Sequence, residues 1–250
     1  MHIFEEKYFR SSKGKINYLQ HGNSDKLLIF QHGWVGWPMY ARSFVQAFGN
    51  AGYQTIFPYL PSHGSSFGLK TTDGFEEVVM VMKEFVGQFK EKRIYFIGHS
   101  LGGAVGWRLA QDNKNLISKL IIINGYMKYH DESTLRLFWH WLHSRVYDGF
   151  SSWKRRLPIW EDPELEELKL PSWKSLAARK LLETMEIPNK TIDIPVLAVW
   201  GEKDRLCPKF IVEDILKSAK NLKSVTVSGG HYWFSWQKPK LFSLIKDFIG

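Results

Sequence analysis

The chain has 250 residues, 44% of them hydrophobic and 24% charged, and a formal net charge of +9 at pH 7. This length and composition suit one large buried core, which excludes a disordered chain and argues against several independent domains. No apolar run reaches the roughly 18 residues that span a bilayer, so we expect no stable membrane insertion. Lysine and arginine are scattered, which predicts a solvated basic surface and no nucleic-acid partner.

The beginning of the chain and its cysteine content indicate the compartment. Residues 1–7 include early acidic side chains and no long apolar segment, unlike a secretory signal. Cys207 is the single cysteine, so no internal disulfide can form. We therefore expect a cytoplasmic protein, with Cys207 as a packing residue rather than a nucleophile.

Apolar runs typical of buried strands alternate with amphipathic runs typical of helices. The runs 3–9 and 15–20 predict an antiparallel hairpin at a sheet edge. Further strands are predicted at 26–31, 53–57, 93–98, 119–124, 195–200 and 224–228. Helices are predicted at 41–51, 72–89, 101–112, 209–219 and 239–248. This alternation predicts an α/β fold with a mostly parallel sheet and helices on both faces.

The alternation stops between residues 126 and 191, where no clear strand is found. Five of the eleven tryptophans fall in this segment, and four prolines divide it into short pieces. The runs 135–146 and 173–185 predict helices. We interpret 126–191 as an insertion into a core domain formed by 1–125 and 192–250.

A serine stands where the strand at 93–98 is predicted to end. Residues 98–102 read Gly-His-Ser-Leu-Gly, the G-x-S-x-G pattern of a nucleophile elbow. Small residues let the backbones approach, while Ser100 takes a strained conformation that presents its hydroxyl. A plain Gly-Ser loop is the alternative, but the order of strand, serine and helix favours the elbow. We predict Ser100 as the nucleophile.

The loop after the strand at 26–31 carries the next part of the predicted site, because ligands of doubly wound sheets bind at the carboxyl ends of strands. It reads His32-Gly33-Trp34, and a tight turn at Gly33 would direct the Trp34 backbone N–H inward. The N–H of Leu101, at the start of the next helix, would be the second donor. Together these two groups predict an oxyanion hole.

Two further loops supply an acid and a base. Asp204 follows the run 195–200 and would orient an imidazole, with Glu202 as a weaker candidate and a helix cap or surface salt bridge as the alternative. His231 follows two glycines on the last loop. The chain order Ser100, Asp204, His231 is one of the known orders of a hydrolytic triad. We predict His231 as the general base that takes the serine proton.

No compact metal-ligand spacing, second cysteine, G-x-G-x-x-G or P-loop accompanies these residues, so we expect no metal and no cofactor. Trp34, Trp37 and Trp233 lie near the predicted site and indicate an apolar substrate pocket, to which tryptophans of the insertion would contribute. Ordinary core packing is the alternative for each of them.

These residues together resemble the α/β-hydrolase fold family. The motifs at 32–34 and 98–103, with Asp204 and His231, occur in the family's order. The resemblance covers nearly the whole chain outside the insertion. It implies an eight-stranded sheet whose second strand is antiparallel, and a helical cap inserted after the sixth strand. The chain departs from the family at Tyr59 and Ser62, which replace an aspartate and the first glycine of a Pro-Gly-x-Gly-x-Ser motif.

A serine nucleophile in this family implies acyl transfer to water, unlike the aspartate chemistry of its dehalogenases and epoxide hydrolases. We therefore expect a serine esterase that cleaves a small or medium apolar carboxylic ester, or a thioester, through an acyl-enzyme. Three alternatives stay open: a hydrolase acting on an acidic acyl carrier protein, suggested by the basic charge; a C–C bond hydrolase; and a ligand-binding receptor that retains the triad. Ala104 replaces an arginine found in the menaquinone-synthesis enzymes of this fold.

Overall fold

The computed structural model describes residues 4–34, 41–66, 73–113, 115–127, 139, 142–143, 146 and 179–250. Most of the predicted insertion at 126–191, including most of its expected helix at 135–146, lies outside these residues, and so does Trp37. The cap and its boundaries therefore stay predictions. Among the described helices, none has the length and apolar character needed to cross a membrane.

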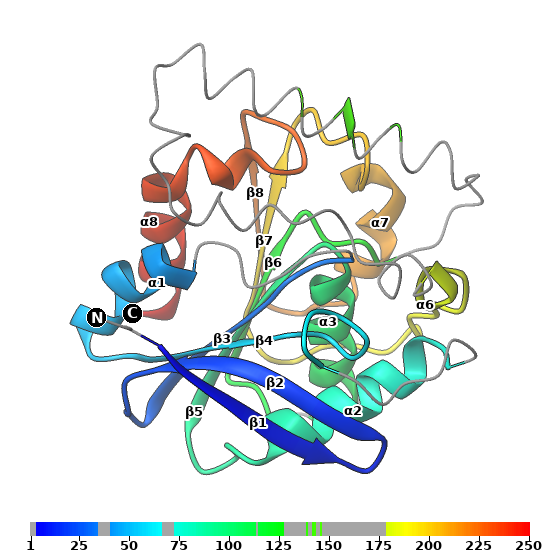
Figure 1. The fold of residues 1–250 in the computed structure, drawn as a ribbon. Helices are drawn as coiled ribbons and strands as arrows, with labels where there is room; N and C mark the ends of the chain where they lie inside the picture. The colour runs from blue at the N-terminus through cyan, green and yellow to red at the C-terminus, as the bar shows by residue number, and fades with distance from the viewer. Residues whose placement is uncertain are drawn as a thin grey trace.

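The protein is built on one eight-stranded sheet with the order β1-β2-β4-β3-β5-β6-β7-β8 (Figure 1). The strands are β1 (Glu5–Ser11), β2 (Gly14–His21), β3 (Lys26–Gln31), β4 (Gln54–Pro58), β5 (Arg93–His99), β6 (Lys119–Ile123), β7 (Val196–Gly201) and β8 (Leu222–Val227). β2 runs antiparallel to both of its neighbours, and all the other pairs are parallel. The predicted mostly parallel sheet with an antiparallel second strand is confirmed.

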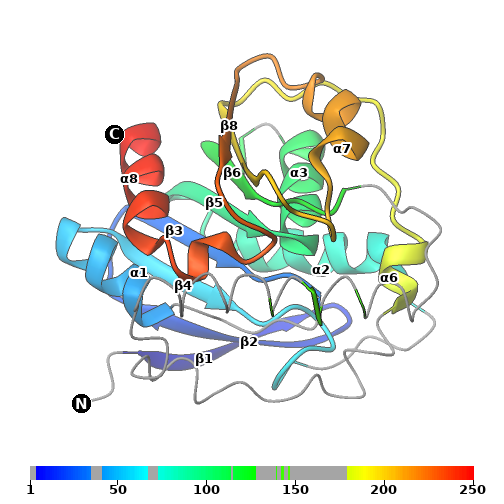
Figure 2. The ribbon, with the colours of Figure 1, turned by 90° about the horizontal axis from the view of Figure 1, so that it is seen from above.

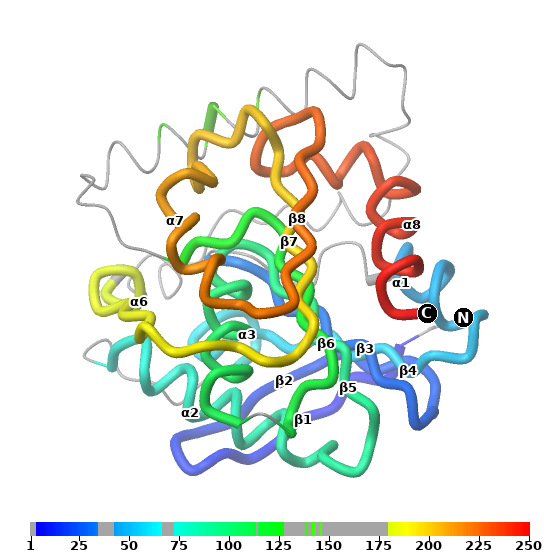
Figure 3. The backbone as a smooth tube through the Cα atoms, turned by 180° about the vertical axis from the view of Figure 1, so that it is seen from behind, coloured from blue at the N-terminus to red at the C-terminus, as the bar shows by residue number. Residues whose placement is uncertain are grey.

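Helices cover both faces of this sheet (Figures 2 and 3). α1 and α8 lie on one face, and α2, α3 and α7 lie on the other. The bounds are α1 (Ala41–Phe48), α2 (Phe75–Gly87), α3 (Leu101–Asp112), α6 (Arg179–Glu183), α7 (Lys209–Leu216) and α8 (Lys238–Ile249), with 3-10 turns at η1 (Gly49–Ala51) and η2 (Trp233–Ser235).

Alternating side chains of the central strands build two apolar layers, because successive residues of a strand point to opposite faces. In β5, Ile94 and Phe96 pack with α2 and α3, whereas Tyr95 and Ile97 pack with α1 and α8. All four side chains are buried. The run of four apolar residues in β5 is thus explained by burial on both sides of the sheet.

Helix ends differ from the sequence prediction where the chain forms hydrogen bonds with segments outside the helix. The helix predicted at 209–219 ends at Leu216, because Ala219 pairs with Ile192 in an isolated parallel bridge. The helix predicted at 72–89 begins only at Phe75, whose backbone N–H donates to Thr184 Oγ1 at 2.9 Å. Tertiary partners contribute to both boundaries, and at the start of α2 the Glu77 side chain also accepts the Gly74 N–H at 2.8 Å.

The strand order reverses at β3, which has β4 on one side and β5 on the other. In doubly wound sheets such a switch point opens a crevice at the carboxyl ends of the strands. Gln31 pairs with Gly98 across β3 and β5, so the turn at 32–34 lies beside His99 and Ser100. The fold therefore brings the first two predicted parts of the site together.

Candidate active site

Ser100 occupies a strained turn between β5 and α3. Its backbone has φ 54° and ψ −120°, a region that residues other than glycine rarely adopt. Hydrogen bonds fix both sides of the turn: the Ser100 N–H donates to Ile123 O at 3.0 Å, and Ser100 O accepts from Gly103 N at 2.9 Å and Tyr126 N at 3.0 Å. Neighbouring strands thus hold the conformation that the elbow pattern predicts.

Backbone-to-backbone contacts press the start of α3 against the end of β3. A Cβ atom on Gly102 would lie 2.4 Å from Gln31 O, and one on Gly33 would lie 2.7 Å from Ser100 Cβ. Only glycine permits these approaches. Trp34 follows directly on Gly33, and Leu101 is the first residue of α3, where a backbone N–H has no intrahelical acceptor. Leu101 therefore follows Ser100 in the chain, and Trp34 follows a glycine whose backbone lies against Ser100.

His32 fixes the turn that leads to Trp34. Its Nδ1–H donates to Gly33 O at 2.8 Å, and its Nε2 accepts the Leu60 N–H at 3.0 Å, which sets the tautomer. Burial, with a further contribution from the neighbouring His63, lowers the pKa of His32 to about 3. The imidazole thus stays neutral near pH 7 and serves as a clamp between two loops.

Asp204 and His231, the predicted acid and base, form a buried hydrogen-bonded pair. The two side chains are 2.9 Å apart between Asp204 Oδ2 and His231 Nδ1, and each is 1% exposed. Burial alone would raise the pKa of Asp204, but the charge and hydrogen bond of His231, with further donors, lower it below its usual value. Among the described residues, Pro208 rather than Asp204 is the N-cap of α7, and Glu202 is exposed.

Four donors surround the Asp204 carboxylate. Oδ1 accepts the backbone N–H groups of Leu206 and Cys207, both at 2.9 Å, and Oδ2 accepts from His231 and from Asn124 Nδ2. A carboxylate that receives this many hydrogen bonds stays ionised. The group can therefore stabilise an imidazolium on His231 without taking its proton.

Among the described residues, no hydrogen bond joins Ser100, the predicted nucleophile, to His231, the predicted base. Ser100 Oγ instead lies 3.9 Å from Cys207 Sγ, a buried side chain of the core. Catalytic hydrogen bonds are often long without substrate and tighten in the reacting complex.

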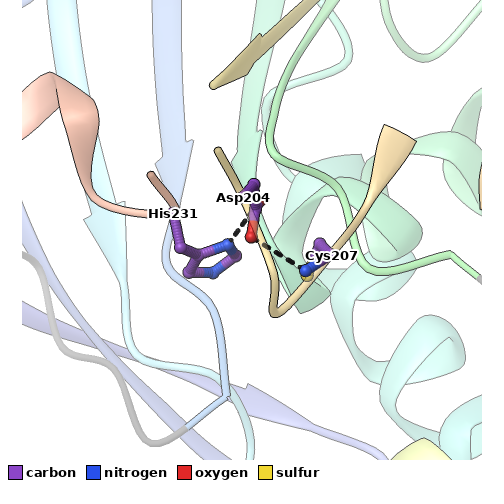
Figure 4. A group of neighbouring side chains, drawn as sticks. All are labelled: Asp204, Cys207 and His231. Carbon is purple, nitrogen blue, oxygen red and sulfur yellow. Dashed lines mark hydrogen bonds and ion pairs between the residues drawn. The ribbon is translucent and has the colours of Figure 1, made fainter. Parts of the chain in front are cut away.

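Asp204, Cys207 and His231 together present three metal-type donors within 4.8 Å of one another (Figure 4). The figure shows Asp204 between the other two, bonded to the ring of His231 and to the backbone nitrogen of Cys207. Both carboxylate oxygens are already engaged by N–H donors. The arrangement therefore serves the orientation of the acid, and a cation would have to displace those donors.

His99, the variable residue before the serine, is a site residue that the sequence analysis did not single out. Its Nε2 lies 3.3 Å from His231 O, and because a carbonyl only accepts, this nitrogen carries the proton. The two imidazole rings are tilted with centroids 4.7 Å apart. Burial, with a contribution from His231, lowers the pKa of His99 well below its usual value. The feature of the sequence that could have identified His99 is its position next to Ser100.

Asn124, directly after β6, is the second residue that the sequence analysis passed over. It is fully buried and has φ 48°. Its amide nitrogen donates to Asp204 Oδ2, and its amide oxygen accepts the Trp233 Nε1–H at 2.8 Å. An uncharged polar residue at the carboxyl end of a buried strand was the available signal.

The predicted pocket tryptophans occupy different environments. Trp34 is partly exposed and packs against the core on the α2 and α3 side of the sheet. Trp233 is 0% exposed and belongs to the core on the α1 and α8 side. Its indole supports Asn124 from within the core, so it offers no exposed wall to a substrate. Trp37 lies outside the described residues, and the pocket stays a prediction.

Comparison with known proteins agrees with this architecture. The family described as alpha/beta hydrolase fold matches residues 26–159, which is more than half of the chain. The chain belongs to the α/β-hydrolase fold family. It is an enzyme of the hydrolase class, as the relatives below also indicate.

One relative is the 2-hydroxy-6-oxononadienedioate/2-hydroxy-6-oxononatrienedioate hydrolase of a Pseudomonas species, 22% identical over 97% of this chain and 96% of that protein. Among solved structures, a hydrolase from Pseudomonas aeruginosa has a TM-score of 0.77 at 17% identity, covering 98% of both chains. The thioesterase domain of the curacin biosynthetic pathway has a TM-score of 0.72 at 18% identity, covering 98% of this chain and 100% of that domain. At such identities the structural likeness establishes the fold alone.

Proposed function

We propose that this enzyme is a serine hydrolase that cleaves a carboxylic ester or thioester of a small or medium apolar acyl group. The observation that carries the proposal is the buried Asp204–His231 pair, 2.9 Å apart, beside a serine held on a strained elbow. A poor nucleophile such as a hydroxyl needs a base that an anion keeps oriented. These three residues supply the nucleophile, the base and the anion.

In the proposed reaction Ser100 Oγ attacks the acyl carbon while His231 Nε2 takes its proton. The carbonyl oxygen becomes an oxyanion, for which the backbone N–H groups of Trp34 and Leu101 are the donors. Collapse breaks the bond to the leaving group, which receives the proton from His231. Water, activated by the same imidazole, then attacks the acyl-serine and releases the carboxylic acid.

A panel of p-nitrophenyl esters and acyl thioesters of increasing chain length tests this proposal. Ser100→Ala and His231→Ala should each lower kcat/KM by about a thousandfold or more, because the triad acts as a unit. A fluorophosphonate should label Ser100, as read by peptide mass spectrometry. Ser65→Ala, at an exposed serine, is the matched control. Undiminished turnover in Ser100→Ala would exclude the mechanism.

Hydrolysis of a C–C bond is the second candidate, because the Pseudomonas relative covers almost the whole chain. Its name gives that protein a dicarboxylate substrate with a ketone at position 6. Incubation with 2-hydroxy-6-oxononadienedioate distinguishes C–C bond hydrolysis from ester hydrolysis, and mass spectrometry identifies the products. Cleavage faster than that of every ester in the panel would favour the C–C reaction.

The carrier-protein alternative rests on the net charge of +9, and it requires a salt-sensitive preference for carrier-bound esters.

A further inference from the structure

A buried chain of hydrogen bonds runs through the site behind the reacting atoms. Trp233 Nε1 donates to Asn124 Oδ1 at 2.8 Å, Asn124 Nδ2 donates to Asp204 Oδ2, and His231 Nδ1 lies 2.9 Å from the same oxygen. The four residues come from the ends of β6, β7 and β8, and none is more than 7% exposed. These side chains link three strand ends, in addition to the backbone hydrogen bonds between them.

The identity of Trp233 fixes which way the amide of Asn124 faces. An indole N–H can donate but never accept, so the atom that receives it must be the amide oxygen. The amide NH₂ therefore faces Asp204 Oδ2, and it can only donate there. This orientation follows from chemistry, although the oxygen and nitrogen of an amide have nearly the same shape.

Asn124 also has a backbone that an ordinary side chain would avoid. Its φ of 48° lies in the left-handed region, which asparagine tolerates better than most residues and glycine tolerates best. The backbone N–H donates to Val199 O at 3.0 Å, so β7 holds the residue in place. Buried strain at a polar residue beside a reactive pair points to a role in the site.

We propose that Asn124 is a positioning residue for Asp204, and that Trp233 fixes the orientation of the Asn124 amide. The amide donor holds the carboxylate so that Oδ2 faces His231, while the backbone donors of Leu206 and Cys207 hold Oδ1. Trp233 lies two residues after His231 on the same loop. The loop that presents the base therefore also orients its acid, and this inference rests on the proposed triad.

Two substitutions separate the amide donor from the backbone strain. Asn124→Gly accepts the positive φ but removes the donor, and Asn124→Asp keeps the shape and the acceptor for Trp233 but places a second carboxylate against Asp204. Each should lower kcat about 10- to 100-fold, as expected for a lost hydrogen bond to a charged group, with KM changed less than about twofold. Asn115→Gly, at an exposed asparagine, is the control.

The pH profile supplies a readout that a merely structural residue would not move. In Asn124→Asp the added negative charge favours imidazolium, so the acidic limb of kcat/KM should move to higher pH. Trp233→Phe should lower kcat in the same direction, and the double variant Asn124→Gly/Trp233→Phe should be no slower than Asn124→Gly alone, because both act through one chain. Trp236→Phe, in the same core layer, is the matched control.

Two results are kept distinct by this design. Full activity and an unshifted pH profile in folded Asn124→Gly and Asn124→Asp, with Asp204→Asn inactive, would overturn the role of Asn124 and leave the triad standing. Activity that survives in Asp204→Asn would overturn the triad, and with it the reason for positioning that carboxylate. Circular dichroism of each variant establishes that it is folded.

Discussion

Cys207 contributes to the site through its backbone as well as through its buried thiol. Its N–H donates to Asp204 Oδ1 at 2.9 Å, and its carbonyl accepts the Trp200 indole N–H at 2.7 Å. Both contacts are independent of the side chain. The sequence predicts a packing role for the thiol. In the structure the thiol also lies 3.9 Å from Oγ of Ser100, the proposed nucleophile.

Removal of this thiol should therefore leave catalysis largely intact. In Cys207→Ala the backbone donors to Asp204 persist, so we expect kcat/KM within about fivefold of the parent, and destabilisation of about 1 kcal/mol from the small cavity. Ester hydrolysis and urea unfolding measure the two effects. A loss as large as that in Ser100→Ala would instead make the sulfur part of the chemistry.

The residues of the predicted triad could be identified from sequence because each occupies a strand end with its own signal: a G-x-S-x-G pattern, an acid after an apolar run, and a histidine after two glycines. Asn124 and His99 could not be identified in the same way. The role of the Asn124 amide depends on which atoms face it, and both of its partners lie on the segments after β7 and β8, far along the chain. Spacing carries no information about such contacts.

At the scale of elements, the junction of β3, β5 and α3 is the most tightly constrained part of the fold. Gly102→Ala would place a methyl group 2.4 Å from the carbonyl oxygen of Gln31, a backbone atom that β-sheet pairing holds in place. We expect a loss of about 3 kcal/mol or more in the free energy of unfolding, from overpacking against a rigid partner. Activity should fall too, because Ser100 moves with the start of α3.

The matched control is Gly87→Ala at the end of α2, where an added methyl group would meet no atom within 4 Å. There the substitution should raise the free energy of unfolding by about 0.5–1 kcal/mol, because alanine favours the helix and restricts the unfolded chain. Urea unfolding of both variants measures the contrast. Equal stabilities for the two would contradict the close approach of α3 and β3.

The order of elements and most strand positions were predictable because strands buried on both faces read as continuous apolar runs. β3 and α3 have the bounds that the sequence predicts, and the hairpin of β1 and β2 is found at the sheet edge. Ends set by distant partners were not predictable. The isolated parallel bridge between Ala219 and Ile192, beyond the end of α7, is one example. Another is the donation from Phe75 N–H to Thr184, since these residues are far apart in the chain.

For the molecule as a whole, buried neutral histidines couple stability to pH. Burial lowers the pKa of His32 to about 3 and that of His63 to about 4, from an ordinary value of 6.5. Between pH 6.5 and about 4 the unfolded chain therefore binds protons at both positions while the folded protein binds neither. The free energy of unfolding should fall as the pH falls, by about 1.4 kcal/mol per pH unit for each histidine.

Urea unfolding at pH 7, 6 and 5 measures this slope. His63→Asn should make it shallower, because asparagine can keep the donor that Nδ1 gives to Pro61 O but cannot titrate. Nε2 of His63 has no partner among the described residues, so little else is lost. His143→Asn, at an exposed histidine, should leave the slope as it is. A wild-type stability that is constant from pH 7 to 5 would contradict the buried neutral state.

The turn that follows β8 cannot be replaced by the corresponding loop of a relative without an effect on the proposed site. His231 and Trp233 lie on it, and the indole N–H of Trp233 donates to Asn124, which follows a strand more than a hundred residues earlier in the chain. A loop transplanted from a relative would bring its own base but would leave Asn124 with an amide free to flip. A graft that replaces the last loop of this protein should therefore replace the residue after β6 with it.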